Sequence, residues 1–234
     1  MVPRQPDDTS RNGSTAQAEP NSGAVADRRL NESEQASVDA IIIGAMRAGT
    51  TTLADVLNTH DDIGLSREKE TDYFLGKASW NRGPQWYVAQ FDPAKRIKLE
   101  ASPNYTKRQA FPGVPERVSK VAPRCKFLFI ARDPVARARS QYAHTFLSGA
   151  DIPAPEDLPG SDEFKHLIDV SCYAAQLDPW FGLFPRDRFL FMEFERLVGN
   201  PERELARVAQ FLEIEDRWAG IYDVISRDEG RNSQ

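Results

Sequence analysis

The sequence predicts an α/β protein, with a parallel sheet flanked by helices in a single domain. Short apolar runs rich in β-branched and aromatic residues alternate along the chain with segments of helical period. That alternation is the pattern of a parallel sheet covered by helices on its faces. A length of 234 residues is enough for one hydrophobic core and leaves little for a second domain.

Strands are predicted wherever β-branched and aromatic residues form a short continuous run. These runs lie at residues 39–43, 97–99, 126–130 and 188–192, and a shorter one lies at 63–65. Because segments of helical period separate the runs, the strands are expected to pair in parallel.

Helices are predicted between these strands. Apolar residues recur at helical spacing within residues 53–57, 118–121, 173–184 and 205–212. Pro134 and Pro201 each follow a good helix cap, Asp133 and Asn200, so a helix is expected to begin at each proline. Residues 148–160 are rich in Pro, Asp and Gly and are expected to form a loop.

Residues 1–37 are predicted to be a disordered tail, and residues 38–234 the folded domain. The tail is rich in Ser, Asn, Asp, Gln, Pro and Gly and lacks apolar periodicity, so it cannot bury enough surface to offset the entropy of ordering it. It lacks the apolar core of a secretory signal, and no run in the chain is long enough to cross a bilayer. We therefore expect a soluble, cytoplasmic protein with no membrane partner.

Composition and residue spacing argue against several classes of function. The net charge of −5 is unfavourable for a protein that coats nucleic acid. His60, His144 and His166 are far apart and predict neither a zinc site nor a histidine-based triad, so no metal is expected. Cys125 and Cys172 have no metal-ligand spacing and are expected to be structural thiols.

The strongest functional signal is the segment Ile41–Leu53, in which a predicted strand passes through a turn of small residues into an amphipathic helix. The start of such a helix presents backbone N–H groups and the positive end of the helix dipole, which together attract an anion. Gly44 and Gly49 allow the backbone to come close to that anion. The segment predicts a fold of the P-loop type.

The loop departs from the pattern of nucleoside triphosphatases. Gly44 and Gly49 have the spacing of Gly-x-x-x-x-Gly-Lys-Ser/Thr, but Thr50 stands in place of the lysine and the basic residue is Arg47. Asp133 could hold magnesium but is better suited to cap a helix. A terminal phosphoryl group carries about two charges and recruits a divalent metal. A sulfuryl group carries only one negative charge, so backbone N–H groups and one or two cationic side chains suffice to bind it without a metal.

A second cationic element follows the predicted strand at residues 126–130. Arg132 stands just after this strand, at the edge where ligands bind in open α/β sheets. Ser140 lies about two turns into the next helix and offers a hydroxyl to the same anion. Arg137 lies on that helix too, and the sequence leaves open whether it belongs to the site or is an ordinary solvated residue.

These two elements resemble the nucleotide site of sulfotransferases that use 3′-phosphoadenosine-5′-phosphosulfate (PAPS), above all the heparan-sulfate and carbohydrate branch and its bacterial relatives. The resemblance implies that Arg47, Ala48, Gly49, Thr50 and Thr51 bind the 5′-phosphosulfate. It implies that Arg132 and Ser140 bind the 3′-phosphate, and that 3′,5′-adenosine bisphosphate (PAP) is the product. Arg47 takes the position of a family Lys or Arg that contacts the bridging oxygen, which gives it a catalytic role.

The segment 66–74 is a charge run that by itself predicts a solvated loop. The family places its catalytic glutamate in a similar Lys-Glu-x-x-Phe/Tyr-Phe context, which implies that Glu70 is the general base. Where heparan-sulfate enzymes have a histidine and a lysine, this chain has Asp72 and Ala101. A highly sulfated polysaccharide is therefore a poor candidate, and the expected acceptor is a hydroxyl or amine of a carbohydrate or small metabolite. Trp180 is expected in the core rather than as a sugar platform.

The resemblance covers roughly residues 38–213, and the family's closing basic loop has no clear counterpart after it. Arg227 and Arg231 are candidates to replace that loop. A non-catalytic nucleotide-binding module with this fold and a P-loop nucleotide kinase stay open as alternatives. The sequence does not indicate an oligomeric state.

Overall fold

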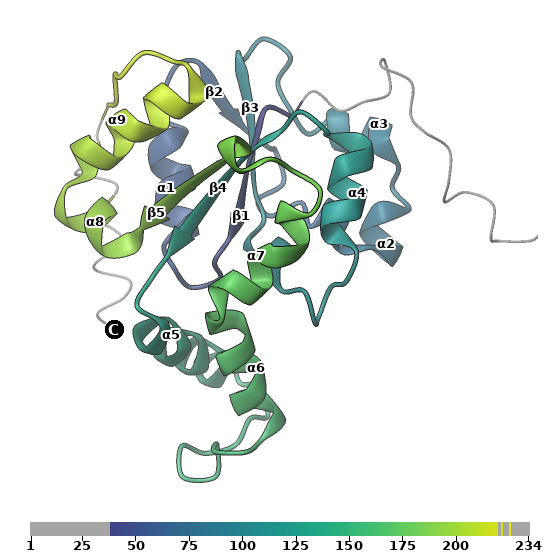
Figure 1. Ribbon diagram of the computed structural model, residues 1–234, viewed down its shortest axis with the longest axis vertical. Coiled ribbons are helices and arrows are strands. Elements are labelled where there is room, and N and C mark those ends of the chain that lie inside the picture. Colours follow the sequence, from purple (N-terminus) through teal and green to yellow (C-terminus); the bar gives the residue numbers. More distant parts are fainter. Residues whose placement is uncertain (1–37, 220, 222–224, 226–234) are drawn as a thin grey trace, which may run out of the picture.

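A computed structural model of the protein describes residues 38–219, 221 and 225. Five strands form one parallel sheet in the order β2-β3-β1-β4-β5 (Figure 1). The strands are β1 (Ala40–Gly44), β2 (Ile63–Leu65), β3 (Ile97–Ala101), β4 (Lys126–Ala131) and β5 (Phe189–Glu193). The predicted α/β class and every predicted strand are confirmed, with small shifts at the strand ends. The predicted tail, Arg227 and Arg231 lie outside the described residues.

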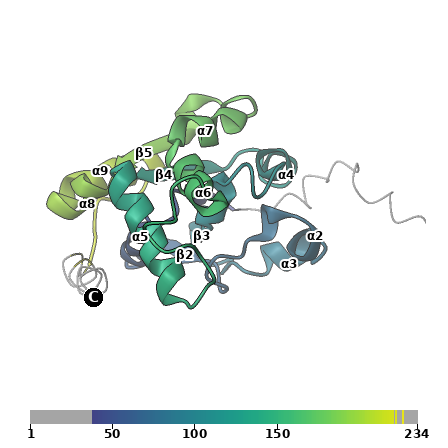
Figure 2. The same ribbon diagram turned by 90° about the horizontal axis from the view of Figure 1, so that it is seen from below.

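Helices cover the sheet on both sides. In Figure 1, α1, α8 and α9 lie to one side of the strands, and α4 and α7 lie to the other. Seen from below, α5 and α6 lie in front of the strands (Figure 2). The helices are α1 (Thr50–Leu57), α2 (Lys77–Trp80), α3 (Pro84–Val88), α4 (Val114–Val121), α5 (Pro134–Leu147), α6 (Asp162–Ser171), α7 (Tyr173–Phe181), α8 (Phe194–Gly199) and α9 (Pro201–Leu212). Short 3-10 turns occupy Tyr73–Leu75, Pro103–Thr106 and Arg186–Arg188.

Two predicted helix starts are confirmed at their caps. The Asp133 side chain accepts a hydrogen bond of 2.8 Å from the N–H of Ala136, and Asn200 accepts one of 3.3 Å from the N–H of Arg203. Each cap satisfies an N–H group that the first helical turn leaves without an intrahelical acceptor. Asp133 therefore serves as a cap, as the sequence predicts, and residues 148–160 form the expected loop.

The core lies on both faces of the central strands β1 and β4, whose apolar side chains are almost fully buried. Trp180 on α7 is only 1% exposed, and its ring centroid lies 5.1 Å from that of Phe127 on β4. The expectation that Trp180 belongs to the core is confirmed. Cys125 is buried as predicted, but Cys172 is exposed because it lies at the junction of α6 and α7. Within the described residues, no helix has the length and apolar character to cross a membrane.

Replacing Trp180 with alanine should lower the free energy of unfolding by about 3–5 kcal/mol, because a large buried side chain leaves a cavity behind it. Phe146→Ala on α5 is the matched control, since this aromatic ring is 56% exposed and surface changes usually cost about 0.5 kcal/mol or less. Urea unfolding of both variants measures the difference. Equal destabilisation by the two changes would contradict the placement of Trp180 in the core.

Candidate active site

The loop between β1 and α1 lies at the carboxyl edge of the sheet and is closely packed. The N–H of Ala45 donates a hydrogen bond of 2.9 Å to the carbonyl of Ile130, which ties the loop to β4. Gly49 has a φ of 86°, and a Cβ at this position would lie 2.4 Å from Cδ2 of Phe194. Positive φ and the close aromatic ring both favour glycine here. The helix therefore begins at Thr50 with its first N–H groups at the edge of the sheet.

The structure brings the two predicted nucleotide-binding elements together. The Nε of Arg47 donates a hydrogen bond of 3.2 Å to the hydroxyl of Ser140, which is 93 residues away in sequence. Nη1 of Arg132 lies 3.5 Å from the carbonyl oxygen of Arg47. The Arg132 guanidinium also lies 4.8 Å from the ring centroid of Phe194, within cation–π range. Two guanidinium groups and a hydroxyl thus meet beside the start of α1.

Glu70 shares a cavity with the start of α1. The cavity has a volume of about 150 Å³, and Thr50, Thr51 and Glu70 are among the residues that line it. Ala101, at the end of β3, lines the same cavity, as does Arg67. The predicted base and the predicted anion-binding hydroxyls therefore face one space, which is the geometry that transfer between two bound groups requires.

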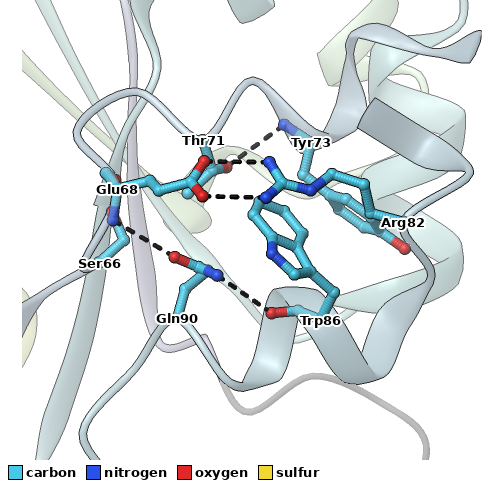
Figure 3. Close-up of polar contacts among 7 residues, drawn as sticks. All are labelled: Ser66, Glu68, Thr71, Tyr73, Arg82, Trp86 and Gln90. Carbon is cyan, nitrogen blue, oxygen red and sulfur yellow. Dashed lines mark hydrogen bonds and ion pairs between the residues drawn. The ribbon is translucent and has the colours of Figure 1, made fainter. Parts of the chain in front are cut away.

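Glu68, the other glutamate of this charge run, is held in an ion pair (Figure 3). Its carboxylate accepts hydrogen bonds of 3.0 and 2.9 Å from Arg82, whose guanidinium lies 3.4 Å from the ring centroid of Trp86. The N–H of Glu68 also donates to the side-chain oxygen of Gln90 at 3.3 Å. The hydrogen bond from Arg82 lowers the pKa of Glu68. Glu68 thus serves to hold the loop, and Glu70 is the better candidate for the base.

Asp72 lies next to Glu70 and is half-buried. The side-chain amide of Asn104 donates a hydrogen bond of 3.1 Å to the Asp72 carboxylate. Burial raises the pKa of Asp72 and the hydrogen bond from Asn104 opposes this rise, while the charge of Glu70 raises the pKa and that of Lys107 lowers it. At the position where the resemblance implies a histidine, this chain thus has a carboxylate that the amide of Asn104 holds in place.

Lys107 supplies a positive charge that the sequence analysis did not single out. Burial lowers the pKa of Lys107, as does the nearby Arg137, while Asp72 and Glu70 raise it. Lys107 also lowers the pKa of His166, although burial is the larger cause. Lys107 thus brings a positive charge close to the carboxylates of Asp72 and Glu70. Over the described part of the chain, no group of three or more His, Cys, Asp or Glu residues is arranged to hold a metal ion.

Arg137 is not a solvated residue, although the sequence left that interpretation open. It is completely buried on α5. Its guanidinium donates to the carbonyl of Leu167 at 2.8 Å and to the hydroxyl of Ser171 at 2.9 Å, and lies 3.5 Å from the carbonyl of Met46. Burial lowers the pKa of Arg137. This arginine joins the β1–α1 loop to α6, and only the packing of α5 against α6 could have shown it.

Two further residues at the site escaped sequence reasoning. Phe194, the first residue of α8, packs against both Gly49 and Arg132. Glu100 lies in β3 with no exposed surface, and four hydroxyl groups bind its carboxylate. The available signal for Glu100 was its place directly after the predicted strand at residues 97–99, because a carboxylate buried there requires several hydrogen-bond donors.

The fold and site together define an α/β protein in which a helix start and a carboxylate line one cavity, with two arginines beside that helix start. The family model described as the sulfotransferase domain matches residues 37–229. The chain therefore belongs to the sulfotransferase family of enzymes, which confirms the resemblance drawn from the sequence.

Individual relatives agree with this assignment. Mouse heparan sulfate glucosamine 3-O-sulfotransferase 3A1 is 34% identical over 209 residues, which cover 85% of this chain and 51% of the relative. Human heparan sulfate glucosamine 3-O-sulfotransferase 5 is 29% identical over 203 residues, or 81% of this chain and 57% of the relative. The chain thus spans about half the length of these curated relatives.

Solved structures share the fold. A sulfotransferase from Alicyclobacillus acidocaldarius superposes with a TM-score of 0.68 and 25% identity, covering 77% of this chain and 83% of that one. A sulfotransferase from Mycobacterium avium, at 11% identity, has a TM-score of 0.56 and covers 85% of this chain and 69% of its own. The second likeness concerns the fold alone.

Arg137→Met should lower the free energy of unfolding by about 1–3 kcal/mol, because buried carbonyl groups lose their donor. Arg139→Met is the matched control, since Arg139 is exposed on the same helix. Chemical denaturation of both variants, followed by circular dichroism, measures the effect. If both variants were as stable as the wild type, Arg137 would not hold the β1–α1 loop to α6.

Proposed function

We propose that this protein transfers a sulfuryl group from PAPS to a hydroxyl or amine of a carbohydrate or small metabolite, with Glu70 as the general base. One observation carries the proposal: Glu70 lines the same cavity as Thr50 and Thr51 at the start of α1. Membership of the sulfotransferase family supports the reaction type.

The residues present fit PAPS as the donor. The start of α1 offers N–H groups and hydroxyls to a phosphosulfate, and Arg47 adds a positive charge. Arg132 and Ser140 are the proposed ligands of the 3′-phosphate, the group that distinguishes PAPS from common adenine nucleotides. A guanidinium can hold such a phosphate through paired, charge-assisted hydrogen bonds. The contact of Arg47 with Ser140 supports this assignment, because it brings the β1–α1 loop and α5 within hydrogen-bond distance of each other.

The transfer proceeds as a direct in-line displacement at sulfur. The acceptor oxygen or nitrogen forms a bond to sulfur while the bond from sulfur to the bridging oxygen of PAPS breaks, and PAP leaves. The acceptor's proton passes to the Glu70 carboxylate. Negative charge grows on the bridging oxygen, where Arg47 and the N–H groups of the β1–α1 loop stabilise it. Because a guanidinium keeps its proton, Arg47 acts by charge and hydrogen bonding.

The proposed acceptor is a carbohydrate or small metabolite with few sulfate groups. The curated relatives named above modify glucosamine units of heparan sulfate, according to their names. In this chain Ala101 lines the cavity at the position where heparan-sulfate enzymes have a lysine. Asp72 adds a carboxylate beside Glu70. Both differences disfavour an acceptor that carries many negative charges.

The wild-type protein should bind PAP at least tenfold more tightly than AMP, without added metal. The reason is the 3′-phosphate, since hydrogen bonds to charged groups contribute roughly 1.5–3 kcal/mol. Isothermal titration calorimetry with PAP, AMP and ATP plus magnesium measures the preference. Arg132→Met should remove most of it, and Arg139→Met should not. Equal affinity for PAP and AMP would contradict the assignment, and a magnesium-dependent preference for ATP would favour a kinase.

Glu70→Gln should lower turnover by about a hundredfold or more, because base catalysis commonly contributes that much. PAP affinity should stay within twofold, since the amide keeps the shape of the side chain. Glu68→Gln is the matched control and should have a mild effect, because this carboxylate pairs with Arg82. Labelled PAPS, with desulfated heparan sulfate oligosaccharides, glucosamine and 4-nitrophenol as acceptors, measures turnover. If Glu68→Gln proved the damaging change, Glu70 would not be the base.

A further inference from the structure

Glu100 is a fully buried carboxylate at the carboxyl end of β3, and hydroxyl groups surround it. Its Oε1 accepts hydrogen bonds from Thr71, from Ser102 at 2.7 Å and from Tyr105 at 2.6 Å. Its Oε2 accepts one from Tyr87. Burial of an ionised carboxylate is costly unless donors satisfy it. Burial raises the pKa of Glu100, and these four hydrogen bonds oppose the rise by stabilising the ionised form.

Three of these hydroxyls also bind the backbone of the loop that carries Glu70. Each accepts a hydrogen bond from one of three consecutive N–H groups. The pairs are Asp72 N–H to Ser102 Oγ at 3.2 Å, Tyr73 N–H to Thr71 Oγ1 at 3.3 Å, and Phe74 N–H to Tyr105 OH at 3.3 Å. Figure 3 shows the contact between Thr71 and the Tyr73 N–H. We call this set of backbone N–H groups, three hydroxyls and Glu100 the hydroxyl relay.

The relay has a fixed direction. A hydroxyl that accepts from a backbone N–H still has one proton to donate. In each of the three cases that proton points to the Glu100 carboxylate, which accepts and does not donate when ionised. A chain of hydrogen bonds that runs from neutral donors to a buried charge strengthens each member. As their common acceptor, Oε1 of Glu100 therefore sets the orientation of all three hydroxyls.

The loop needs such an anchor because its backbone is unusual. Glu70 has a φ of 54° and Asp72 has a φ of 48°, so both are in the left-handed region although neither is glycine. Residues in this region persist where the surrounding structure holds them. Thr71 stands between them with its side chain buried, and it is one of the three relay hydroxyls. The anchor thus begins within the unusual segment: Thr71 supplies a relay hydroxyl, and the N–H of Asp72 donates to another.

We propose that Glu100 is a positioning residue, which fixes the direction of Glu70 toward the cavity by holding residues 71–74 through the hydroxyl relay. This inference rests on the proposed function, in which Glu70 is the base. Glu100 does not touch the reacting groups and acts only through the loop. Loss of the relay should therefore impair turnover more than nucleotide binding, and it should do so only while Glu70 can act as a base.

The first test measures the loop itself. Hydrogen–deuterium exchange of residues 72–74 should become at least tenfold faster in Thr71→Val and in Ser102→Ala. Thr71→Ser should restore protection, because it keeps the hydroxyl. Thr145→Val on α5 is the control for the same chemical change away from the loop. Unchanged exchange in both Thr71→Val and Ser102→Ala would overturn the proposal, and this result does not depend on knowing the acceptor.

The second test is a double-mutant cycle with the labelled PAPS assay described above. Thr71→Val should lower turnover at least tenfold in the wild-type background, while PAP affinity stays within twofold. In the Glu70→Gln background the same change should lower the residual rate less than twofold. An equal loss in both backgrounds would overturn the proposal. A harmless Glu70→Gln would instead reject Glu70 as the base, so the two failures can be told apart.

Discussion

Parallel pairing of β1 with both β3 and β4 is the constraint on which the site depends. Ile42 in β1 is in register with Ala101 on one side and Leu128 on the other. Because the strands are parallel, their carboxyl ends meet at one edge of the sheet, where open α/β sheets bind ligands. This register sets the β1–α1 loop beside the end of β3 and beside Arg132, which follows β4. The β1–α1 loop, the end of β3 and the residues after β4 are distant in sequence, and they thereby lie close together at this edge.

Two buried ionisable side chains, Arg137 and Glu100, each hold a loop at this edge. Arg137 binds backbone carbonyls of the β1–α1 loop and of α6, while Glu100 holds the backbone N–H groups of residues 72–74 through hydroxyls. A buried charge is costly alone, so its hydrogen-bond partners are strongly specified. Arg137 and Glu100 thus each fix the conformation of a loop. Neither side chain lines the cavity that Glu70 and Thr50 share.

The sequence predicted the features that depend on local patterns. Strand runs, the caps at Asp133 and Asn200 and the glycine spacing of the loop all follow from a few neighbouring residues. It missed features that depend on packing between distant segments. The sequence leaves the role of Arg137 open until α6 is known to cover it. The ion pair that holds Glu68 depends on Arg82, 14 residues further on. The roles of the predicted site residues in binding and catalysis stay predictions that the geometry favours.

The relay also leaves the side chain at position 72 outside the anchor that holds residues 72–74. It holds residues 72–74 by their backbone N–H groups, so the side chain at position 72 takes no part in the anchor. The side chain at position 72 can therefore change without removing a hydrogen bond of the relay. In this chain the Asp72 carboxylate is held by Asn104 instead. Variation of side chains on a fixed loop is the usual way in which one scaffold accepts different substrates.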